Sequence, residues 1–484
     1  MITKSDFLDG IQCPYHLWRK KNQKDSLPEP SIAEKFTMEQ GNEVGNLAKR
    51  LFPQGKDLDG LDFNDNLART KRTMDDENPI FEAGFVHDEC YARADIIQPS
   101  QEGDGWELIE VKSGTSVKDI NLYDVAFQVH VIRSSGIRLS RFYIMHLNKR
   151  YYREGDLDIA SLFERRDVTE DVENILESIP GLIEKVKDIP ASTSPPDPGV
   201  VSKGRINGNH DCKKSGCIDI GRDSVFNLYS AGKRTEKLTD DGIFDIKEIG
   251  DDFSLTEKQD IQKKSHLNNT PHVNVKKIKD FLSSLEYPLH YLDFEAFSTA
   301  VPRFDGLKPY SQVPFQYSLH IRTEENTEAE HKEYIYRGDS DPRKEFIKAL
   351  IDDVEDKGSI IVYSKSFEVG RLKELATSFP EYSEDMEKMI SRIVDLLVPF
   401  REFSYYSPSQ SGSASIKKVL PALTGKNYEG MDIADGNTAA VQFYKATYMG
   451  EGDKRKIIDD LLEYCKLDTY AEVLIHDELE KAVR

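Results

Sequence analysis

The period of the hydrophobic pattern switches between that of helices and that of strands along this chain, which restricts it to folds that combine the two. Apolar residues recur with a helical period at 36–52, 121–133 and about 168–188. Short β-rich segments bounded by Gly, Asp and Pro lie at 80–86, 91–98, 106–112 and 141–147. From about residue 287 strands come first and helices follow. The sequence therefore predicts an α/β fold class in which mixed sheets are flanked by helices.

The composition changes near residue 192 and divides the chain. The segment STSPPDPG (192–199) is typical of a linker, and 484 residues suffice for two or three domains. We expect domains at 1–200 and 285–484, joined by a cysteine-containing and helical connector at 201–284. Within this connector, two short helices around a Gly turn fit either a helix-hairpin-helix unit that binds nucleic-acid backbones or an ordinary helical bundle.

The charge excludes some classes of function. The formal net charge of −21 argues against a general basic coat for nucleic acid or an anionic membrane, although a local groove or an acidic metal site is compatible with it. The N-terminal MITKSDFLDG is too charged for a signal peptide, and no apolar run reaches the roughly 18 residues of a membrane helix. Five cysteines do not form a disulfide framework in a chain of this length. We expect a cytoplasmic protein without a membrane partner.

Two neighbouring predicted strands carry a candidate metal site. Asp95 lies in ARADII, and Glu110 and Lys112 lie in ELIEVKSG of the next strand. Residues i and i+2 of a strand share one face, so Glu110 and Lys112 face the same space, and pairing of the strands would bring Asp95 to them. Two carboxylates can hold Mg²⁺ or Mn²⁺, and a lysine beside them can orient or deprotonate a water. The alternative is an edge hairpin whose charges face solvent.

Residues 1–220 resemble RecB-like nucleases of the PD-(D/E)XK superfamily, in particular the branch of exonucleases that act in CRISPR adaptation. The matching segments are IQCPYHLW, GNEVGNLA, ARAD, IEVKSG and the helix that contains Gln128. The resemblance implies a restriction-endonuclease-like domain in which Asp95 and Glu110 bind metal, Lys112 is catalytic and Gln128 helps to position the substrate.

The chain departs from that family at two positions. The family often has a metal-binding His in the early helix, where this chain has Gly45, which leaves Glu43 as the nearby candidate ligand. The family's glutamine motif usually continues to a Tyr four residues later, where this chain has Ile132. We therefore expect altered metal affinity or substrate binding at this site.

Members of this branch that carry an iron–sulfur cluster bind it with one early and three late cysteines. Cys13 matches the early position, and Cys212 and Cys217 match two of the late ones, but IDIGRDSVFNL follows where the third would be. Because four thiolates complete a [4Fe–4S] site, we expect this cluster to be lost or fragile. His210 is an alternative fourth ligand for zinc or a cluster, and a degenerate segment with free thiols is the remaining interpretation.

The last block carries a second group of candidate metal ligands. Asp293 and Glu295 in HYLDFEAF share one strand face between apolar neighbours, where two buried carboxylates are costly unless a cation compensates them. Glu368 follows the buried strand SIIVYS, and Tyr464 and Asp468 lie four residues apart on one helical face. These groups could bind two divalent cations about 4 Å apart, which activate water and stabilise the leaving oxygen. Considered alone, the pair Asp293 and Glu295 also fits a charge pair at a strand end, and the pair Tyr464 and Asp468 also fits an amphipathic helix.

Residues 285–484 resemble the RNase H-like fold of DEDD 3′–5′ exonucleases. The D-F-E segment is similar to the first motif of that family and Y-x-x-x-D to the third, which implies that the five residues above form a catalytic centre of the tyrosine subclass. SIKKVLPAL and DIADGNTAA are similar to intermediate segments of bacterial members. At the middle motif the family usually has Asn and then Asp, where this chain has Ser364 and Glu368. The order of the domains resembles a prokaryotic family of uncharacterised two-nuclease proteins.

A strip rich in cations and aromatic rings is a candidate for contact with nucleic acid. It comprises Arg133, Arg138, Arg141, Lys149, Arg150 and Arg153, interleaved with Phe142, Tyr143, Tyr151 and Tyr152. Cations suit phosphates, and rings suit the stacked bases of single strands. The alternative, equally compatible with the sequence, is that half of these aromatic rings belong to the hydrophobic core.

Together these features predict a divalent-metal-dependent nuclease with two active sites, which hydrolyses phosphodiester bonds of DNA and acts on single strands or strand ends in repair or defence. Exonuclease action is favoured over endonuclease action. One alternative is that a single domain cuts, as a 3′–5′ exonuclease on DNA or RNA. Another is a non-enzymatic scaffold that binds nucleic acid through degenerate nuclease folds.

Overall fold

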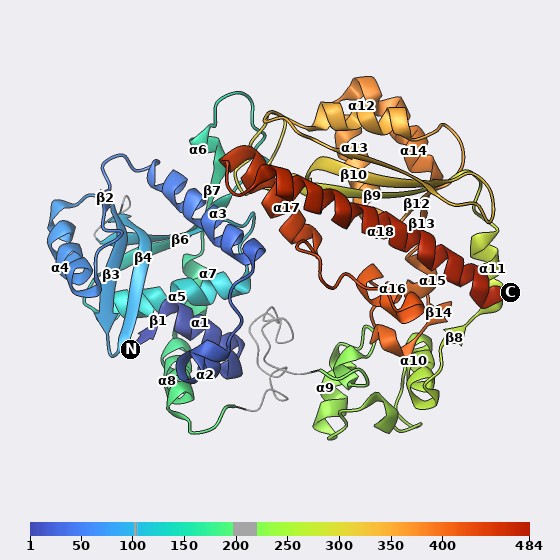
Figure 1. Ribbon diagram of the computed structural model, residues 1–484. Helices are drawn as coiled ribbons and strands as arrows, with labels where there is room; N and C mark the ends of the chain where they lie inside the picture. Colours follow the sequence, from blue (N-terminus) through green and yellow to red (C-terminus); the bar gives the residue numbers. More distant parts are fainter. Residues whose placement is uncertain (101–102, 104, 197–219) are drawn as a thin grey trace. The chain divides into compact units, whose positions relative to one another are not determined.

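The computed structural model describes residues 1–100, 103, 105–196 and 220–484 (Figure 1). The chain forms two compact units. Unit 1 comprises Met1–Asp219 and Thr299–Ser311, and unit 2 comprises Ile220–Ser298 and Gln312–Arg484. The described part of the expected connector therefore belongs to unit 2, and a short segment of the expected C-terminal domain belongs to unit 1.

Unit 1 combines a mixed sheet with helices. Its strands are β1 (Ile2–Thr3), β2 (Lys56–Asp57), β3 (Ile80–His87), β4 (Cys90–Pro99), β5 (Trp106–Lys112), β6 (Leu139–Leu147) and β7 (Phe163–Asp167). Its helices are α1 (Lys4–Gln12), α2 (Pro14–Asn22), α3 (Ile32–Lys49), α4 (Phe63–Thr73), α5 (Asp119–Ser134), α6 (Ile159–Leu162), α7 (Thr169–Leu176) and α8 (Ile179–Ala191). The strand order is β2-β3-β4-β5-β6-β7, with β1 beside β4. Strand β4 is antiparallel to β3 and β5, whereas β5 is parallel to β6.

Helices cover both faces of this sheet. On one face Phe127 of α5 belongs to a core cluster that includes Ala94 of β4. On the other face Val44 of α3 packs with Ile96 and Ile109, which lie opposite each other on β4 and β5. Because both faces are buried, polar side chains on β4 and β5 must find partners inside the unit.

Arg153 anchors the segment Thr299–Ser311 within unit 1. Its guanidinium donates hydrogen bonds to the carbonyls of Pro302 and Arg303 at 3.1 and 3.0 Å, and its own carbonyl accepts from the amide of Gly306 at 2.8 Å. Unit 1 is therefore assembled from two stretches of chain that lie far apart in the sequence.

Unit 2 contains a five-stranded sheet, a two-stranded sheet and many helices. Its strands are β8 (His272–Val273), β9 (Leu289–Phe297), β10 (Val313–Arg322), β11 (Glu330–Ile335), β12 (Ile360–Val362), β13 (Ile393–Asp395) and β14 (Tyr405–Tyr406). Its helices are α9 (Lys233–Asp240), α10 (Glu257–Asn268), α11 (Val275–Leu282), α12 (Arg343–Asp353), α13 (Ser366–Ser378), α14 (Ser383–Arg392), α15 (Val398–Arg401), α16 (Ile416–Thr424), α17 (Gly436–Tyr444) and α18 (Lys454–Val483).

Strand β9 is the centre of the larger sheet, whose order is β11-β10-β9-β12-β13. It is antiparallel to β10 and parallel to β12. Leu292 and Phe294 of β9 join the core formed with α12, α13 and α14. Side chains alternate along a strand, so Asp293 and Glu295 face the opposite side, where α18 packs against β9 and β10 (Figure 1).

Two expected helical segments differ in the structure. The helix expected at about 168–188 is divided into α7 and α8, because Pro180 lies in the first turn of α8 and has no N–H with which to continue the preceding helix. In the connector, α9 ends before Gly242, the 3₁₀ turn Ile246–Glu248 follows it, and the next helix, α10, begins only at Glu257. The expected pair of helices around this Gly turn is therefore not formed.

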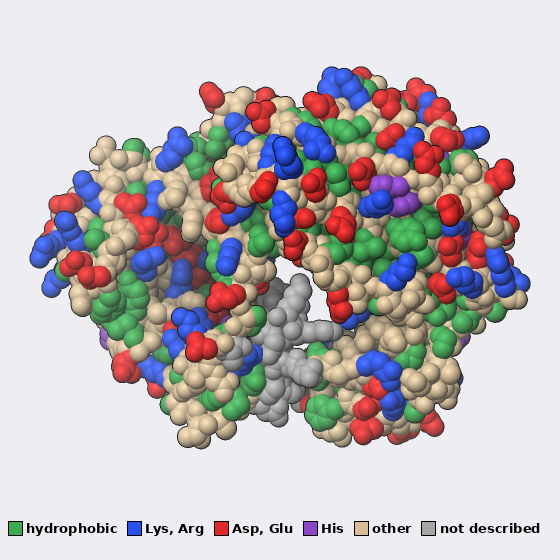
Figure 2. Space-filling view, viewed as in Figure 1, with side chains coloured by type: hydrophobic (Ala, Val, Ile, Leu, Met, Phe, Trp, Pro, Cys, Tyr) green, Lys and Arg blue, Asp and Glu red, His purple; other side chains and the backbone are tan. Residues whose placement is uncertain are grey.

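On the face drawn in Figure 2, acidic and basic side chains of the described residues are interspersed over both units. None of the helices in the described part of the chain combines the length and the apolar character that crossing a membrane requires.

Candidate active sites

The four residues predicted for the first site lie together in unit 1. Glu110 on β5 accepts a hydrogen bond at Oε1 from Lys112 Nζ at 2.6 Å and one at Oε2 from Gln128 Nε2 at 2.7 Å. Asp95 on β4 accepts at Oδ2 from the backbone amide of Val111 at 2.7 Å. Antiparallel pairing of β4 with β5, and packing of α5 against β4, bring these side chains into one cluster.

Two further charged residues complete this cluster. Lys4 Nζ lies 2.7 Å from Glu110 Oε1 and 3.6 Å from Asp124 Oδ1. Asp124 also accepts from Lys112 at 2.6 Å and from Gln128 at 2.8 Å. The sequence contains a signal for Asp124, which lies four residues before Gln128 on the same helical face. The sequence contains no such signal for Lys4, which lies at the start of the chain.

The charges of this cluster set its protonation at neutral pH. Burial and the neighbouring Glu110 raise the pKa of Asp95 to about 7. Burial also acts to raise the pKa of Glu110, but the ammonium groups of Lys112 and Lys4 outweigh it and hold that pKa below its usual range. Burial acts to lower the pKa of Lys112, and Asp124 and Glu110 outweigh it, so the pKa is raised. Glu110 is therefore ionised and Lys112 is protonated.

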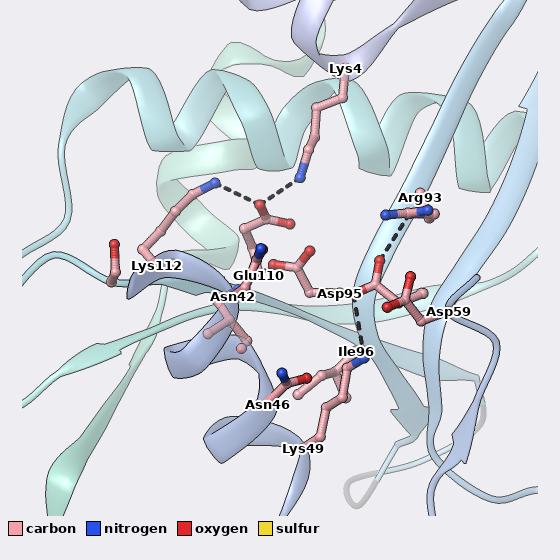
Figure 3. A pocket seen from close by; sticks show the side chains of 15 residues that line it. Lys4, Asn42, Asn46, Lys49, Asp59, Arg93, Asp95, Ile96, Glu110 and Lys112 are labelled. Atoms are coloured by element: carbon pink, nitrogen blue, oxygen red, sulfur yellow. Dashed lines mark hydrogen bonds and ion pairs between the residues drawn. The ribbon is translucent and has the colours of Figure 1, made fainter. Parts of the chain in front are cut away.

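A cavity of about 680 Å³ opens beside these residues (Figure 3). Asp95, Glu110 and Lys112 line one part of it, and α3 lines another with Gly41, Asn42, Gly45, Asn46 and Lys49. A Cβ atom built on Gly41 or Gly45 would meet nothing within 4 Å. The two helical glycines thus leave open space where larger side chains would project.

Asp95 and Glu110 are the carboxylates with which unit 1 could hold a divalent cation. Lys4 and Lys112 both contact Oε1 of Glu110 and Gln128 donates to Oε2, so a cation bound by this carboxylate would lie beside two ammonium groups that compete with it for the negative charge. Glu43, the candidate replacement for the missing His, is not among the residues of α3 that line the cavity.

Unit 2 brings together three of the predicted metal ligands. Asp293 and Glu295 of β9 and Asp468 of α18 each offer a carboxylate oxygen, and these oxygens lie within 4.8 Å of one another. Glu295 and Asp468 are only 7% exposed. Carboxylate oxygens are the ligands that Mg²⁺ and Mn²⁺ prefer, so this group fits a divalent cation.

Two more buried glutamates lie near this group. Glu368, in the first turn of α13, is 2% exposed, and Glu472 of α18 is 1% exposed. The charges of Asp293, Glu368 and Asp468 all act on Glu472. The sequence predicted Glu368 but missed Glu472, although Glu472 lies four residues beyond Asp468 and so on the same helical face.

Two tyrosines and one lysine border the carboxylates. Tyr428 donates a hydrogen bond from its hydroxyl to Asp468 Oδ1 at 2.6 Å. Lys417 Nζ lies 5.6 Å from the ring centre of Tyr428 and 5.7 Å from that of Tyr464. The predicted Tyr464 is 4% exposed, and burial and the charge of Asp468 raise its pKa, so its hydroxyl stays protonated. Local sequence patterns gave no reason to select Tyr428, whereas Lys417 lies in SIKKVLPAL, a segment that the resemblance included without assigning this lysine a role.

Burial raises the pKa of every carboxyl group in this cluster. The pKa of Glu295 rises to about 8 through burial and the charge of Asp468, with Lys417 opposing. Burial raises the pKa of Glu368 to about 8, and that of Asp468 to about 6 against the hydrogen bond from Tyr428. The pKa of Asp293 lies well above its usual value because of burial and Asp468. The metal-free cluster therefore binds protons at pH values where ordinary carboxyl groups have lost them.

We expect the metal-free chain to lose stability as the pH rises from 6.5 to 8. Glu295 and Glu368 bind more protons folded than unfolded in this range, and such groups lower the free energy of unfolding as the pH rises. The buried His320 and His476, each with a pKa lowered by burial to about 4, oppose this loss with a smaller effect, because their imidazoles are already about half deprotonated at pH 6.5 in the unfolded chain. Thermal unfolding in EDTA should show a melting temperature at least about 2 °C lower at pH 8 than at pH 6.5.

Mn²⁺ should reverse most of this loss, because it takes the place of the protons. The Glu295→Gln variant, which removes one of the titrating groups, should lose less stability over the same range. A melting temperature that stays constant or rises from pH 6.5 to 8 in EDTA would contradict the expectation.

The predicted cysteine ligands are only partly described. Cys13 is buried where α2 begins, and its Sγ accepts from the backbone amide of His16 at 3.3 Å. Cys212 and Cys217 lie outside the described residues, so the cluster stays a prediction. Cys465 is buried elsewhere, with its Sγ 3.7 Å from Asp293 Oδ2.

The strip of cations and rings does not present a continuous row to solvent. Arg133 pairs with Glu173 at 2.7 Å, and Arg141 pairs with Asp167 at 3.1 Å. Phe142 is fully buried. Together with the engagement of Arg153 by backbone carbonyls, these contacts assign much of the strip to the packing of unit 1.

Comparisons with known proteins match parts of the chain. Residues 290–415 match a family described as "Domain of unknown function (DUF2779)". The chain is similar to "Uncharacterized protein MG366 homolog" of Mycoplasma pneumoniae, with 29% identity over 41% of this chain, and to "Uncharacterized protein UU173" of Ureaplasma parvum, with 26% identity over 42%. The matches span about a third, 33%, of the length of each relative. No solved structure matches the chain significantly.

Proposed function

We propose that the chain is a divalent-metal-dependent nuclease whose principal catalytic centre lies in unit 2. The observation that carries the proposal is the convergence of Asp293, Glu295 and Asp468, with ligand oxygens within 4.8 Å of one another under helix α18. No salt bridge among the described residues involves any of the three. Buried carboxylates of like charge are costly without a cation to compensate them.

The topology of the two units supports this proposal. In unit 2 the central strand β9 carries the acidic pair, β10 and β11 are added antiparallel on one side, and β12 and β13 are parallel on the other, as expected for an RNase H-like fold. In unit 1 the neighbouring strands β4 and β5 carry Asp95, Glu110 and Lys112 beside a cavity, as expected for a restriction-endonuclease-like fold.

Each residue of the unit 2 site has its own role in the proposed hydrolysis. A cation held by the carboxylates supplies an acidified water and stabilises charge on the phosphodiester. Tyr464 stays protonated and can therefore donate its hydroxyl proton in a hydrogen bond to the attacking water or to a phosphate oxygen. Tyr428 fixes the orientation of Asp468. Lys417, whose charge acts on Glu295 and Asp468, adds positive charge where the anionic strand would approach.

The first unit fits two roles. Asp95, Glu110 and Lys112 form the arrangement of a metal-dependent nuclease, and cleavage there is our first expectation. The full engagement of Glu110 by two ammonium groups and Gln128 favours a second role, in which unit 1 binds the strand and unit 2 cuts it.

A cleavage assay with end-labelled strands tests the proposal. The whole chain is incubated with 5′- and 3′-labelled single-stranded DNA and RNA in Mn²⁺, beside an Asp293→Asn variant, a Lys112→Ala variant and their combination. We expect a ladder of products that depends on Mn²⁺ and disappears in the combined variant. Absence of cleavage on every strand would favour the non-enzymatic scaffold, and the direction of the ladder would report the polarity.

Gly45 provides a test of the unit 1 cavity that does not touch its charged residues. We expect Gly45→Leu to lower cleavage by unit 1 about 100-fold, since displacing a substrate by an ångström can cost that much. Stability should not fall, because leucine is a better helix former and the Cβ position is open. Gly181→Leu on α8, where a Cβ atom also meets nothing within 4 Å, is the matched control. Equal rates for Gly45→Leu and the unmodified chain would mean that substrate does not use this cavity.

A further inference from the structure

Lys4 enters the unit 1 cluster from the first helix of the chain. Thr3 caps α1 through a reciprocal pair of hydrogen bonds with Asp6, and the amide of Ile2 donates to the carbonyl of Glu89 at 2.7 Å. These contacts fix the backbone beside Lys4, so its four-carbon side chain can change position without any movement of α1. The side chain is 26% exposed, and it lines the cavity.

Lys4 and Lys112 hold the same oxygen of Glu110. Their Nζ atoms lie 2.7 and 2.6 Å from Oε1, and Figure 3 shows them approaching it from opposite sides. The two lysines differ in their second contact, because Lys112 is 2.6 Å from Asp124 whereas Lys4 is 3.6 Å from it. If Lys4 withdraws, its place on Glu110 is vacated while the contacts of this carboxylate with Lys112 and Gln128 remain. Lys4 is therefore the ammonium group that the cluster can release.

The charge balance of the cluster sets Lys4 against a divalent cation. The cluster has three carboxylates, those of Asp95, Glu110 and Asp124, and two ammonium groups, those of Lys4 and Lys112. A divalent cation added to all five groups would leave one uncompensated positive charge in a largely buried site, which is unfavourable. If Lys4 withdraws, the three carboxylates balance the cation and Lys112.

The carboxylates of unit 2 have no such competitor in the described part of the chain. No ion pair there joins an ammonium or guanidinium group to Asp293, Glu295 or Asp468. The charge of Lys417 acts on Glu295 and Asp468, but its Nζ donates to the carbonyl of Ala434 at 2.6 Å. A cation that binds in unit 2 therefore replaces protons, whereas one that binds in unit 1 must also displace a tethered ammonium group.

We propose that Lys4 is a tethered competitor of the divalent cation in unit 1, which holds Glu110 until the cation displaces it and so sets the metal affinity of this site below that of unit 2. The inference rests on the proposed metal-dependent function, and it assigns to Lys4 a role that none of the sequence motifs predicts. Because the ammonium group and the cation exclude each other, each lowers the affinity of the site for the other. Unit 1 would then bind metal only at concentrations at which unit 2 is already occupied.

Binding of Mn²⁺, measured from the electron paramagnetic resonance signal of the free ion, tests this inference independently of cleavage. The whole chain carries Asp293→Asn and Asp468→Asn, so that unit 2 contributes no full site. We expect weak binding with Lys4 intact, and binding at least about 10-fold tighter in Lys4→Gln, since a positive charge that repels the cation is removed. Adding Asp95→Asn to the Lys4→Gln chain should abolish the tight site, which assigns the ion to unit 1.

Further variants and the melting temperature separate the effect of charge from a structural role. Lys4→Arg keeps a cation near Glu110 and should leave the binding of Mn²⁺ weak, whereas Lys4→Met removes the charge as Lys4→Gln does and should tighten it. Lys24→Met changes an exposed lysine in the same N-terminal part of the chain and should have no effect. Both neutral variants leave Glu110 with one partner fewer, so Mn²⁺ should raise their melting temperature more than that of the chain with Lys4.

The outcomes distinguish this inference from the proposed function. Unchanged Mn²⁺ affinity in folded Lys4→Gln and Lys4→Met would overturn the role of Lys4, even if the chain cleaves strands as proposed. Equally tight binding in Lys4→Arg would overturn it too, and so would a unit 1 site as tight as that of a chain with Asp95→Asn alone, in which unit 2 binds the metal. Tighter binding in Lys4→Gln with no cleavage by the unmodified chain would support the role of Lys4 and reject the nuclease function.

Discussion

Replacing Asp468 with asparagine is expected to reduce cleavage by unit 2 at least about 100-fold, since a catalytic cation contributes several kcal/mol to transition-state stabilisation. Asp468 belongs to the three carboxylates whose oxygens lie within 4.8 Å. Asparagine keeps an oxygen that can accept from Tyr428 but loses the negative charge that a divalent cation needs. The measurement is the rate of ladder formation on an end-labelled single strand in a Lys112→Ala background, where unit 1 is silent.

The matched control for this change is Glu463→Gln on the same helix, an exposed position that should keep the full rate. Asp468→Asn removes a buried charge without changing the volume of the side chain, so the metal-free chain should melt at the same temperature or higher. A loss of rate that accompanies unfolding would therefore argue against the metal-ligand role, and so would a normal rate in the folded variant.

The sequence identified the acidic face of β9 because that face depends on one local rule. Side chains alternate along a strand, so Asp293 and Glu295 had to share a face, and the apolar Leu292 and Phe294 had to occupy the other. The same rule placed Glu110 and Lys112 together, and pairing of adjacent strands brought in Asp95. In each case the residues lie close together in the sequence, and the period of the strand or helix determines which of them share a face.

Residues that reach a site through tertiary packing could not be predicted in this way. Lys4 approaches Glu110 from the first helix, more than a hundred positions away, and Tyr428 approaches Asp468 from a segment without regular structure. The segment Thr299–Ser311 belongs to unit 1 although it connects two strands of unit 2. No periodicity within a segment reports a contact of this kind, because the contact depends on where the rest of the chain has folded.

Asp124 and Glu472 form an intermediate class. Each lies four residues from a predicted site residue on the same helix, so the helical period alone could have identified them. What the sequence lacked was a reason to prefer them over other acidic residues on the same helices. Burial supplies that reason, since Asp124 and Glu472 are each 1% exposed, whereas Glu463 faces solvent.

Replacing Lys112 with alanine is expected to reduce cleavage by unit 1 about 100- to 10,000-fold, the usual contribution of a positioned proton donor or acceptor. Lys112 bridges Glu110 and Asp124 at 2.6 Å to each, and these carboxylates raise its pKa, so it enters the reaction as a cation. Its contribution should therefore come from positive charge and hydrogen bonding near the phosphate. The rate is measured in an Asp468→Asn background, with Lys185→Ala on α8 as the exposed control.

Two further variants separate this role from that of a general base. Lys112→Arg keeps a cation at the site and should retain more activity than Lys112→Gln, which keeps a hydrogen-bond donor but no charge. If Lys112 acted instead as a general base, Lys112→Arg and Lys112→Gln would lose activity equally, because arginine does not give up its proton near neutral pH. Equal and large losses in the two folded variants would thus reject the cationic role. Absence of cleavage by the Asp468→Asn chain with Lys112 intact would show that unit 1 does not cut strands.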